Sequence, residues 1–282
     1  MSPLRPTSRA AALVAVPALA LSACGAVKDD AEGPAAGDGG VTTITVGASP
    51  TPHAKILEFV DKELAPEAKL DLEITTFDDY IQPNVQLSEG TLDANYYQHL
   101  PYYEAQVKDR GYEFAHFDGI HIEPFALYSD KVKDVEDLPK GGQIGINNDP
   151  SNQGRALQLL ADHDVITLKE GKDATNATIF DVADNPKELE FKETDPAQLA
   201  RSLQDLDAAV INGNYAIEAD LSTQDALIVE EGKESPYANF LAVQQSNEDN
   251  AALKKLDELL HSPEVKAYIE KTWPNGEVLP AF

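Results

Sequence analysis

The chain has 282 residues, which is enough for one large domain or two small ones. Its 49 acidic side chains oppose 22 basic ones, so the formal net charge is −27 at pH 7. A surface of this sign repels nucleic acid phosphates and anionic lipid headgroups, which excludes both as charge-driven partners. The single cysteine, Cys24, excludes a disulfide framework and, later in the chain, a thiolate metal cluster or a catalytic thiol.

The N-terminus has the pattern of a lipoprotein signal peptide. Arg5 and Arg9 precede an apolar run over residues 11–21, which is too short to span a bilayer. The sequence Leu-Ser-Ala-Cys that ends at Cys24 resembles the bacterial lipobox, in which the cysteine is acylated and becomes the first mature residue. We therefore expect a signal peptide over residues 1–23, a lipid on Cys24, and attachment to the extracytoplasmic face of the cell membrane.

The next stretch predicts a flexible tether over residues 24–40. It is rich in glycine, alanine and aspartate and has no periodicity. A flexible chain of this length reaches roughly 20 to 24 Å. The folded part is therefore expected to stay close to the membrane face.

The rest of the chain alternates strand and helix patterns, which implies an α/β architecture with largely parallel sheets. An extended stretch over residues 112–128 is interrupted by Pro124. The expected strands are 41–46, 70–77, 92–95, 143–146, 188–192, 207–211, 226–229 and 239–243. One helix is expected to begin at Thr51-Pro52 and another to end at Arg110; further helices are expected over 78–87, 151–162 and 196–203. Two amphipathic helices finish the chain, one with the apolar stripe Leu253, Leu256 and Leu260 and the other with Val265, Ile269 and Trp273.

One stretch, Asp93 to Tyr103, concentrates four tyrosines with a histidine, a glutamine and an asparagine. Such a patch suits a site that wraps an apolar group and presents a few oriented polar groups. It contains no pair that resembles a nucleophile and its base, so it favours binding over reaction. A helix start whose tyrosines merely pack on their neighbours remains the alternative.

A second motif, Asn148 to Arg155, lies where a strand ends and a helix begins. Unpaired N–H groups at a helix N-terminus favour an anion, and a guanidinium can hold a carboxylate with two parallel bonds. Only three arginines occur beyond residue 10, which draws attention to Arg155. Helix capping by Ser151 or Asp149, and a surface salt bridge of Arg155, are the competing explanations.

Two asparagines complete the candidate site. Asn212 ends a predicted strand, where α/β proteins place ligand contacts, and Asn239 follows Ser235-Pro236 at a predicted crossing between domains. Together the motifs describe a slot with aromatic walls on one side and an arginine on the other. Amides would then receive an ammonium group.

The segments FDDYIQPN, LDANYYQHLPYY, NDPSNQGRALQLL, AVINGNYA and KESPYANF resemble those of the methionine-binding lipoproteins, the substrate-binding subunits of methionine ABC importers. The resemblance covers residues 41–282. It implies a type II periplasmic-binding-protein fold, in which two α/β lobes joined by two crossing segments close over the ligand. The implied lobes are 41–125 plus 240–282 and 126–239, with crossings near 121–126 and 235–240.

The resemblance also implies roles for individual residues. Tyr80, Tyr97 and Tyr102 would line a thioether pocket with His99 beside them. Arg155 would bind the α-carboxylate with help from Asn152, and Asn212 and Asn239 would contact the polar end of the amino acid. The implied partners are free methionine and an ABC permease with its cytoplasmic ATPase. No cofactor and no metal are expected.

Several alternatives remain open. A metal-binding importer subunit is suggested by His99, His116 and His121, although their spacing matches no standard ligand set. Another small amino acid or a methionine derivative would suit the same slot. The hydrolase, phosphate-loop and zinc-protease motifs are absent from the sequence, which argues against an enzyme. A surface lipoprotein without a transport role is the remaining alternative.

Overall fold

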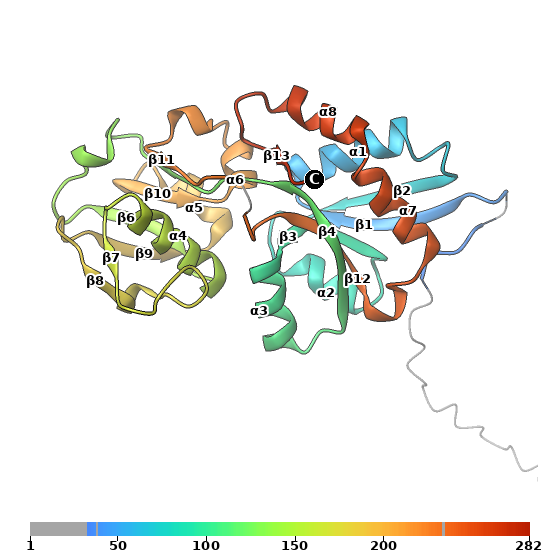
Figure 1. The fold of residues 1–282 in the computed structure, drawn as a ribbon, viewed down its shortest axis with the longest axis horizontal. Helices are drawn as coiled ribbons and strands as arrows, with labels where there is room; N and C mark the ends of the chain where they lie inside the picture. Colours follow the sequence, from blue (N-terminus) through green and yellow to red (C-terminus); the bar gives the residue numbers. More distant parts are fainter. Residues whose placement is uncertain (1–32, 38, 233–234) are drawn as a thin grey trace, which may run out of the picture. The chain divides into compact units, whose positions relative to one another are not determined.

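The structure is a computed structural model that describes residues 33–37, 39–232 and 235–282 (Figure 1). The predicted signal peptide 1–23, the lipidation site Cys24 and the tether up to residue 32 lie outside the described residues. Within the described part, none of the helices is both long and apolar enough to cross a bilayer. The final part of the predicted tether contacts the fold, since Ala36 bridges to Thr42 and the side chain of Asn250 donates to the carbonyl of Pro34 at 3.1 Å.

The first sheet has six strands in the order β13-β4-β12-β3-β1-β2. β1 runs parallel to β2 and β3, whereas β12 runs antiparallel to β3 and β4, and β13 antiparallel to β4. The strands are β1 Thr42–Ala48, β2 Leu70–Thr76, β3 Ala94–His99, β4 Phe114–Ile122, β12 Asn239–Gln244 and β13 Leu279–Pro280.

The second sheet has five strands in the order β11-β5-β10-β6-β9, and β7 pairs with β8 in a small separate ribbon. β6 runs parallel to β9 and β10, whereas β5 runs antiparallel to β10 and β11. The strands are β5 Ala126–Tyr128, β6 Gln143–Asn147, β7 Thr167–Leu168, β8 Val182–Asp184, β9 Glu190–Thr194, β10 Ala208–Ile211 and β11 Ile228–Val229.

Each sheet is packed with helices on both faces (Figure 1). On the first sheet, α1, α7 and α8 cover one face while α2 and α3 cover the other; on the second, α4 lies on one face and α5 and α6 on the other. The helices are α1 Lys55–Glu63, α2 Gln82–Ser88, α3 Leu100–Arg110, α4 Pro150–Asp162, α5 Pro196–Ser202, α6 Gly213–Glu218, α7 Ala251–Leu260 and α8 Pro263–Thr272, with short turns η1 Pro50–Ala54, η2 Val135–Asp137, η3 Ile179–Asp181, η4 Thr223–Asp225 and η5 Gln245–Asn247.

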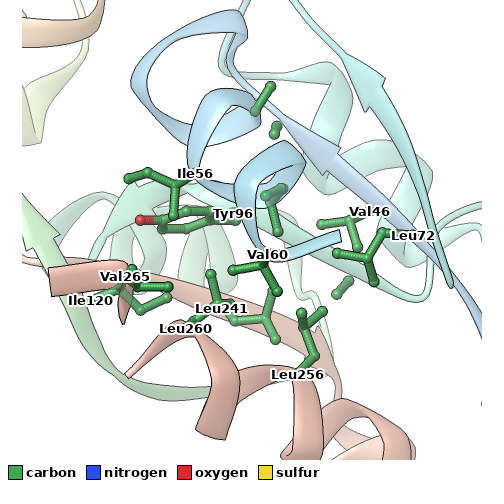
Figure 2. Close-up of a cluster of buried hydrophobic side chains, with 14 of the residues drawn as sticks. Val46, Ile56, Val60, Leu72, Tyr96, Ile120, Leu241, Leu256, Leu260 and Val265 are labelled. Atoms are coloured by element: carbon green, nitrogen blue, oxygen red, sulfur yellow. The ribbon is translucent and has the colours of Figure 1, made fainter. Parts of the chain in front are cut away.

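Strand β12 shows why both faces of the first sheet can be apolar. Successive side chains of a strand point to opposite faces. Leu241 and Val243 therefore join the cluster beneath α1, α7 and α8 (Figure 2), whereas Phe240 and Ala242 join the cluster beneath α2 and α3. Such a strand has the continuous apolar pattern of a sheet that is covered on both sides.

The chain passes between the two sheets twice. It leaves the first sheet after β4 and enters the second at β5, then returns between β11 and β12. We call residues 123–125 the first crossing and residues 230–238, of which 233 and 234 are not described, the second crossing. Both contact or adjoin predicted site residues: Asn239 begins β12 directly after the second crossing, and the carbonyl of Glu123 in the first crossing accepts a hydrogen bond from Arg155.

Several predicted elements differ from the observed ones. The sheets are mixed rather than largely parallel, because the strands on either side of the two crossings, β4, β5, β11 and β12, pair antiparallel with their neighbours. The strand predicted at 92–95 is β3, which continues to His99 because β12 pairs with it as far as that residue. It therefore includes Tyr96 and Tyr97.

Local side-chain and backbone effects explain the other differences. The helix predicted from residue 78 begins at Gln82, because the Asp79 carboxylate accepts the N–H groups of Ile81 and Gln82 at 2.7 and 2.8 Å and holds a turn there. The strand predicted at 188–192 begins at Glu190, since Glu188 has a left-handed backbone with φ 53°. The strand predicted at 226–229 is shortened to Ile228–Val229.

Candidate functional site

A pocket lies where the C-terminal end of β3 and the N-terminus of α4 meet the two crossings. It encloses about 370 Å³ of empty space, counting the part open to solvent. All eight residues predicted to contact a ligand line this pocket. Its lining is Tyr80, Tyr97, Gln98, His99, Tyr102, Glu123, Asn152, Arg155, Asn212, Gly213, Asn214 and Asn239.

Three tyrosines form one wall of the pocket. Tyr97 in β3 and Tyr102 in α3 each donate a hydroxyl hydrogen bond to the backbone carbonyl of Tyr80, both at 2.9 Å. The ring centroid of Tyr80 lies 6.0 Å from that of Tyr97 and 5.8 Å from that of Tyr102. Because the hydroxyls are used in holding the turn that contains Tyr80, the rings themselves are left to line the space.

His99 caps helix α3 and takes part in the same wall. Its Nδ1 accepts the backbone N–H of Tyr102 at 3.2 Å, so Nε2 carries the proton and donates to Asn152 Oδ1 at 3.2 Å. Burial, followed by the positive charge of Arg155, lowers the pKa of His99 to about 3. The ring is therefore neutral at pH 7 and can contact an apolar group without a charge.

The N-terminus of α4 is capped by Asp149, whose carboxylate accepts the backbone N–H of Asn152 at 3.0 Å and also bonds the side chains of Ser151 and Asn152. The capping alternative considered from the sequence is thus realised by Asp149. Asn152 also accepts a bond from the Asn212 side chain at 3.2 Å. These bonds fix the two amides in the pocket lining.

Arg155 lies in the first turns of α4 and is almost completely buried. Its Nε donates to Glu230 Oε1 at 2.9 Å, and its Nη2 donates to Glu230 Oε2 and, at 3.1 Å, to the carbonyl of Glu123. The guanidinium carbon lies 3.9 Å from the centroid of Tyr237 and 4.7 Å from that of Phe125. The competing salt bridge thus exists, but it is a buried one, and Arg155 lines the pocket as well.

The one carboxylate in the pocket lining, Glu123, belongs to none of the motifs in the sequence. This residue follows β4 in the first crossing and is only 7% exposed. Its Oε1 accepts from His121 Nε2 at 2.8 Å. His53 Nε2 lies 3.2 Å from the same oxygen, but its hydrogen bond is to Asn239 Oδ1 at 3.1 Å. The signal in the sequence is its place directly before Pro124, which interrupts the extended stretch.

The protons of this cluster can be assigned from its contacts. The Tyr96 hydroxyl meets His121 Nδ1, so His121 Nε2 carries the hydrogen that points at Glu123. Burial lowers the pKa of His53 to about 4, while burial lowers that of His121 to about 3. Both rings are therefore neutral at pH 7, so neither forms an ion pair with Glu123; His121 donates a hydrogen bond to the carboxylate, and His53 bonds to Asn239. Burial raises the pKa of Glu123, while His53, the backbone N–H of Asn214 and Arg155 oppose that rise.

Asn214 is a second lining residue that was not among the predicted site residues. Its Oδ1 accepts the hydroxyl of Tyr80, whereas its buried Nδ2 has no hydrogen-bond partner among the described residues. A buried donor without a partner is costly in a folded protein. Because Asn214 lines the pocket, a bound ligand could supply the acceptor.

The histidines behind the metal-binding alternative do not come together. His116 is exposed on β4, where its ring contacts the carbonyl of Phe117. Across the described ranges, the group with metal-ligand atoms close together is instead His53, His121 and Glu123, within 4.8 Å of one another. The hydrogen-bond pattern described above accounts for that proximity.

The model of the NlpA lipoprotein family matches residues 44–282. The chain belongs to this family. Methionine-binding lipoprotein MetQ of Bacillus subtilis (strain 168) is 39% identical over 273 residues, which cover 95% of this chain and 96% of the relative. The resemblance inferred from the sequence motifs is therefore confirmed.

Solved structures that are similar in sequence have the same fold. A nutrient-binding protein of Burkholderia cenocepacia bound to methionine has a TM-score of 0.81 and 44% identity, covering 85% of this chain and 100% of that chain. A periplasmic substrate-binding protein of an ABC transporter from Coxiella burnetii has a TM-score of 0.79 and 42% identity, covering 84% and 100%. The predicted two-lobe α/β binding-protein fold is confirmed by these neighbours.

Proposed function

We propose that this lipoprotein captures free methionine outside the membrane and delivers it to an ABC importer. The observation that carries the proposal is the composition of the pocket: one guanidinium, one carboxylate and a tyrosine wall line the same space. This set matches the carboxylate, the ammonium and the apolar side chain of one amino acid. The methionine found in the Burkholderia cenocepacia structure supports the choice of ligand.

The α-carboxylate of methionine would bind Arg155. The Nη1 group of Arg155 makes no hydrogen bond to any described residue and is therefore available to a ligand. Asn152 lines the same pocket with its N–H groups bonded to Asp149, so the further N–H donor is the Nδ2 of Asn214, which has no partner among the described residues. Charge-assisted bonds of this kind are shorter and about twice as strong as neutral ones.

The ammonium group would bind Glu123, with the amide oxygens of Asn212 and Asn239 beside it. The histidines next to this buried carboxylate are neutral, and the positive group near it, Arg155, is already paired with Glu230. A buried charge is costly unless it is paired and hydrogen-bonded. The ligand's ammonium would provide that pairing.

The thioether would lie against Tyr80, Tyr97 and Tyr102, with the neutral ring of His99 beside them. Contacts of sulfur with aromatic rings contribute about 0.3 to 1.5 kcal/mol each. The hydroxyl groups of Tyr97 and Tyr102 are already bonded to the carbonyl of Tyr80, so they do not require a partner in the ligand.

The lobes that close over the ligand would be residues 41–125 plus 240–282 and residues 126–239. The two sheets support this division, since β1 to β4, β12 and β13 form one and β5, β6, β9, β10 and β11 form the other. Two bonds join the lobes: the Tyr80 hydroxyl donates to Asn214 Oδ1, and the Tyr215 hydroxyl donates to the carbonyl of Asp78 at 3.0 Å. A lipid on Cys24 would hold the protein at the extracytoplasmic face of the cell membrane. A permease with a cytoplasmic ATPase would receive the ligand, and the protein itself would catalyse no reaction.

The decisive experiment is mass spectrometry of the small molecules released from freshly purified protein, followed by calorimetry with methionine. We expect methionine in the released fraction, and a loss of affinity of more than about 100-fold in Arg155→Ala, because breaking a buried pair costs roughly 3 to 5 kcal/mol. Arg201→Ala is the matched control, since Arg201 is exposed on α5. Circular dichroism would check that each variant is folded.

Two results would overturn the proposal. One is the absence of methionine binding by the wild-type protein under conditions in which a panel of other amino acids, methionine sulfoxide or zinc raises its melting temperature. The other is a folded Arg155→Ala variant that binds methionine as tightly as the wild-type protein does.

A further inference from the structure

We propose that Glu230 is a positioning residue for Arg155, which holds the guanidinium so that its free edge faces the pocket. Glu230 would thereby set the affinity for ligands that carry a carboxylate. This inference rests on the proposed function, because it concerns the arginine that would hold the ligand's carboxylate.

The contact between the two side chains is bidentate. Nε of Arg155 donates to Oε1 of Glu230 at 2.9 Å, and Nη2 donates to Oε2. The side chains are 5% and 18% exposed, so solvent screens the pair little. With the further bond from Nη2 to the carbonyl of Glu123, three of the five guanidinium hydrogens are committed. Both hydrogens of Nη1 remain free of hydrogen bonds to the described residues.

Glu230 reaches Arg155 from outside the pocket. Arg155 is part of the pocket lining, whereas Glu230, Phe125 and Tyr237, which surround its guanidinium, are not. Glu230 therefore does not occupy the place of a ligand's carboxylate. It fixes one edge of the guanidinium and leaves the other edge to the pocket.

Glu230 is itself held by the backbone of the first crossing. Strands β5 and β11 pair antiparallel with Leu127 opposite Ile228 and Ala126 opposite Val229, and one step further this register brings Phe125 opposite Glu230. The N–H of Glu230 donates to the carbonyl of Phe125 at 2.8 Å, and the N–H of Phe125 donates to Glu230 Oε2 at 3.2 Å. The carboxylate thus cannot turn away from Arg155 without breaking a backbone contact.

The aromatic rings restrict the guanidinium from its faces. Tyr237 of the second crossing lies 3.9 Å from the guanidinium carbon and Phe125 of the first crossing 4.7 Å. Both crossings therefore contribute to the orientation of Arg155. A group that is already oriented before binding loses less entropy when the ligand arrives, which increases affinity.

The test compares two ligands that differ at the carboxylate. Binding of methionine and of methioninamide, in which a neutral amide replaces the carboxylate, is measured by calorimetry for the wild-type protein, Glu230→Gln and Glu230→Ala. We expect Glu230→Gln to lower the affinity for methionine about tenfold, because it loses one hydrogen bond to a charged group. The affinity for methioninamide should fall less than about twofold. Glu231→Gln, at the neighbouring exposed position, should change neither affinity.

The outcomes separate this inference from the proposed function. If Glu230 is merely structural, its substitution will lower the melting temperature and lower the affinity for both ligands by the same factor, which would overturn the inference. The proposed function would still stand if Arg155→Ala abolished methionine binding. A tighter methionine complex in Glu230→Gln would overturn it too, because Glu230 would then be a competitor of the ligand. A wild-type protein that binds neither ligand would overturn both proposals. If Glu230→Ala does not fold, Glu230→Gln, which keeps the size of the side chain, decides the question.

Discussion

Replacing Glu123 by glutamine tests whether the buried carboxylate recognises the ammonium group of the ligand. Glutamine keeps the volume of the side chain, which is 7% exposed, and removes its negative charge. One amide oxygen can still accept from His121 Nε2, which lies 2.8 Å from Glu123 Oε1 in the wild-type protein. The fold should therefore survive, while the partner of the ammonium is lost.

The expected loss follows from the strength of a hydrogen bond to a charged group. Such a bond contributes about 1.5 to 3 kcal/mol, which corresponds to a methionine affinity about 10- to 150-fold weaker in Glu123→Gln. The loss should lie towards the upper end of this range. His53 and His121 are neutral, so apart from Arg155 the ligand's ammonium is the positive group that pairs with the Glu123 carboxylate.

The assay is calorimetry with methionine and with 4-(methylthio)butanoate, which lacks the ammonium group. The wild-type protein should prefer methionine strongly, and Glu123→Gln should lose most of that preference, since the desamino ligand never used the carboxylate. Glu113→Gln is the matched control, because Glu113 is exposed just before β4. An unchanged methionine affinity, or the same factor of loss for both ligands, would refute the assignment of Glu123 to the ammonium.

Two further predictions concern stability. Gly154→Ala should lower the free energy of unfolding by about 1 to 3 kcal/mol, because its Cβ would lie 2.3 Å from the backbone carbonyl oxygen of Ala174; a urea titration that finds no loss would contradict the close approach. Burial lowers the pKa of His53 to about 4 and of His121 to about 3. Below pH 6.5 the unfolded chain therefore binds more protons than the folded protein, and the free energy of unfolding falls by about 2 kcal/mol per histidine between pH 7 and pH 5. The raised pKa of Glu123 acts in the opposite direction. Denaturant melts of His121→Asn should therefore show a shallower fall with acid than the wild-type protein, and equal slopes would contradict the prediction.

Local patterns in the sequence predicted the elements whose ends are set by their own residues. Helix α3 ends before Gly111, which adopts a left-handed backbone with φ 70°, and helix α8 is capped by Ser262. Where a segment far away in the chain determines the end of an element, the predicted boundary differs from the observed one. Strand β3 was predicted too short because the strand that extends its pairing to His99, β12, begins only at Asn239.

The candidate site shows the same division. The tyrosine-rich stretch and the turn before α4 are compact motifs, and the residues predicted from them do line one pocket. Glu123 and Glu230 belong to no motif. Their importance comes from partners 70 or more positions away, since Glu123 contacts His53 at 3.2 Å and Glu230 contacts Arg155 across 75 positions.

The sequence by itself determined the α/β class, the family, and the residue types that suit an amino acid, because these depend on periodicity and on short motifs. The tertiary structure alone decided which charges meet in the pocket and which are already paired. The physical reason is that desolvation and hydrogen bonding act through space: they depend on which groups the two crossings bring together, and the order of residues along the chain does not record that proximity.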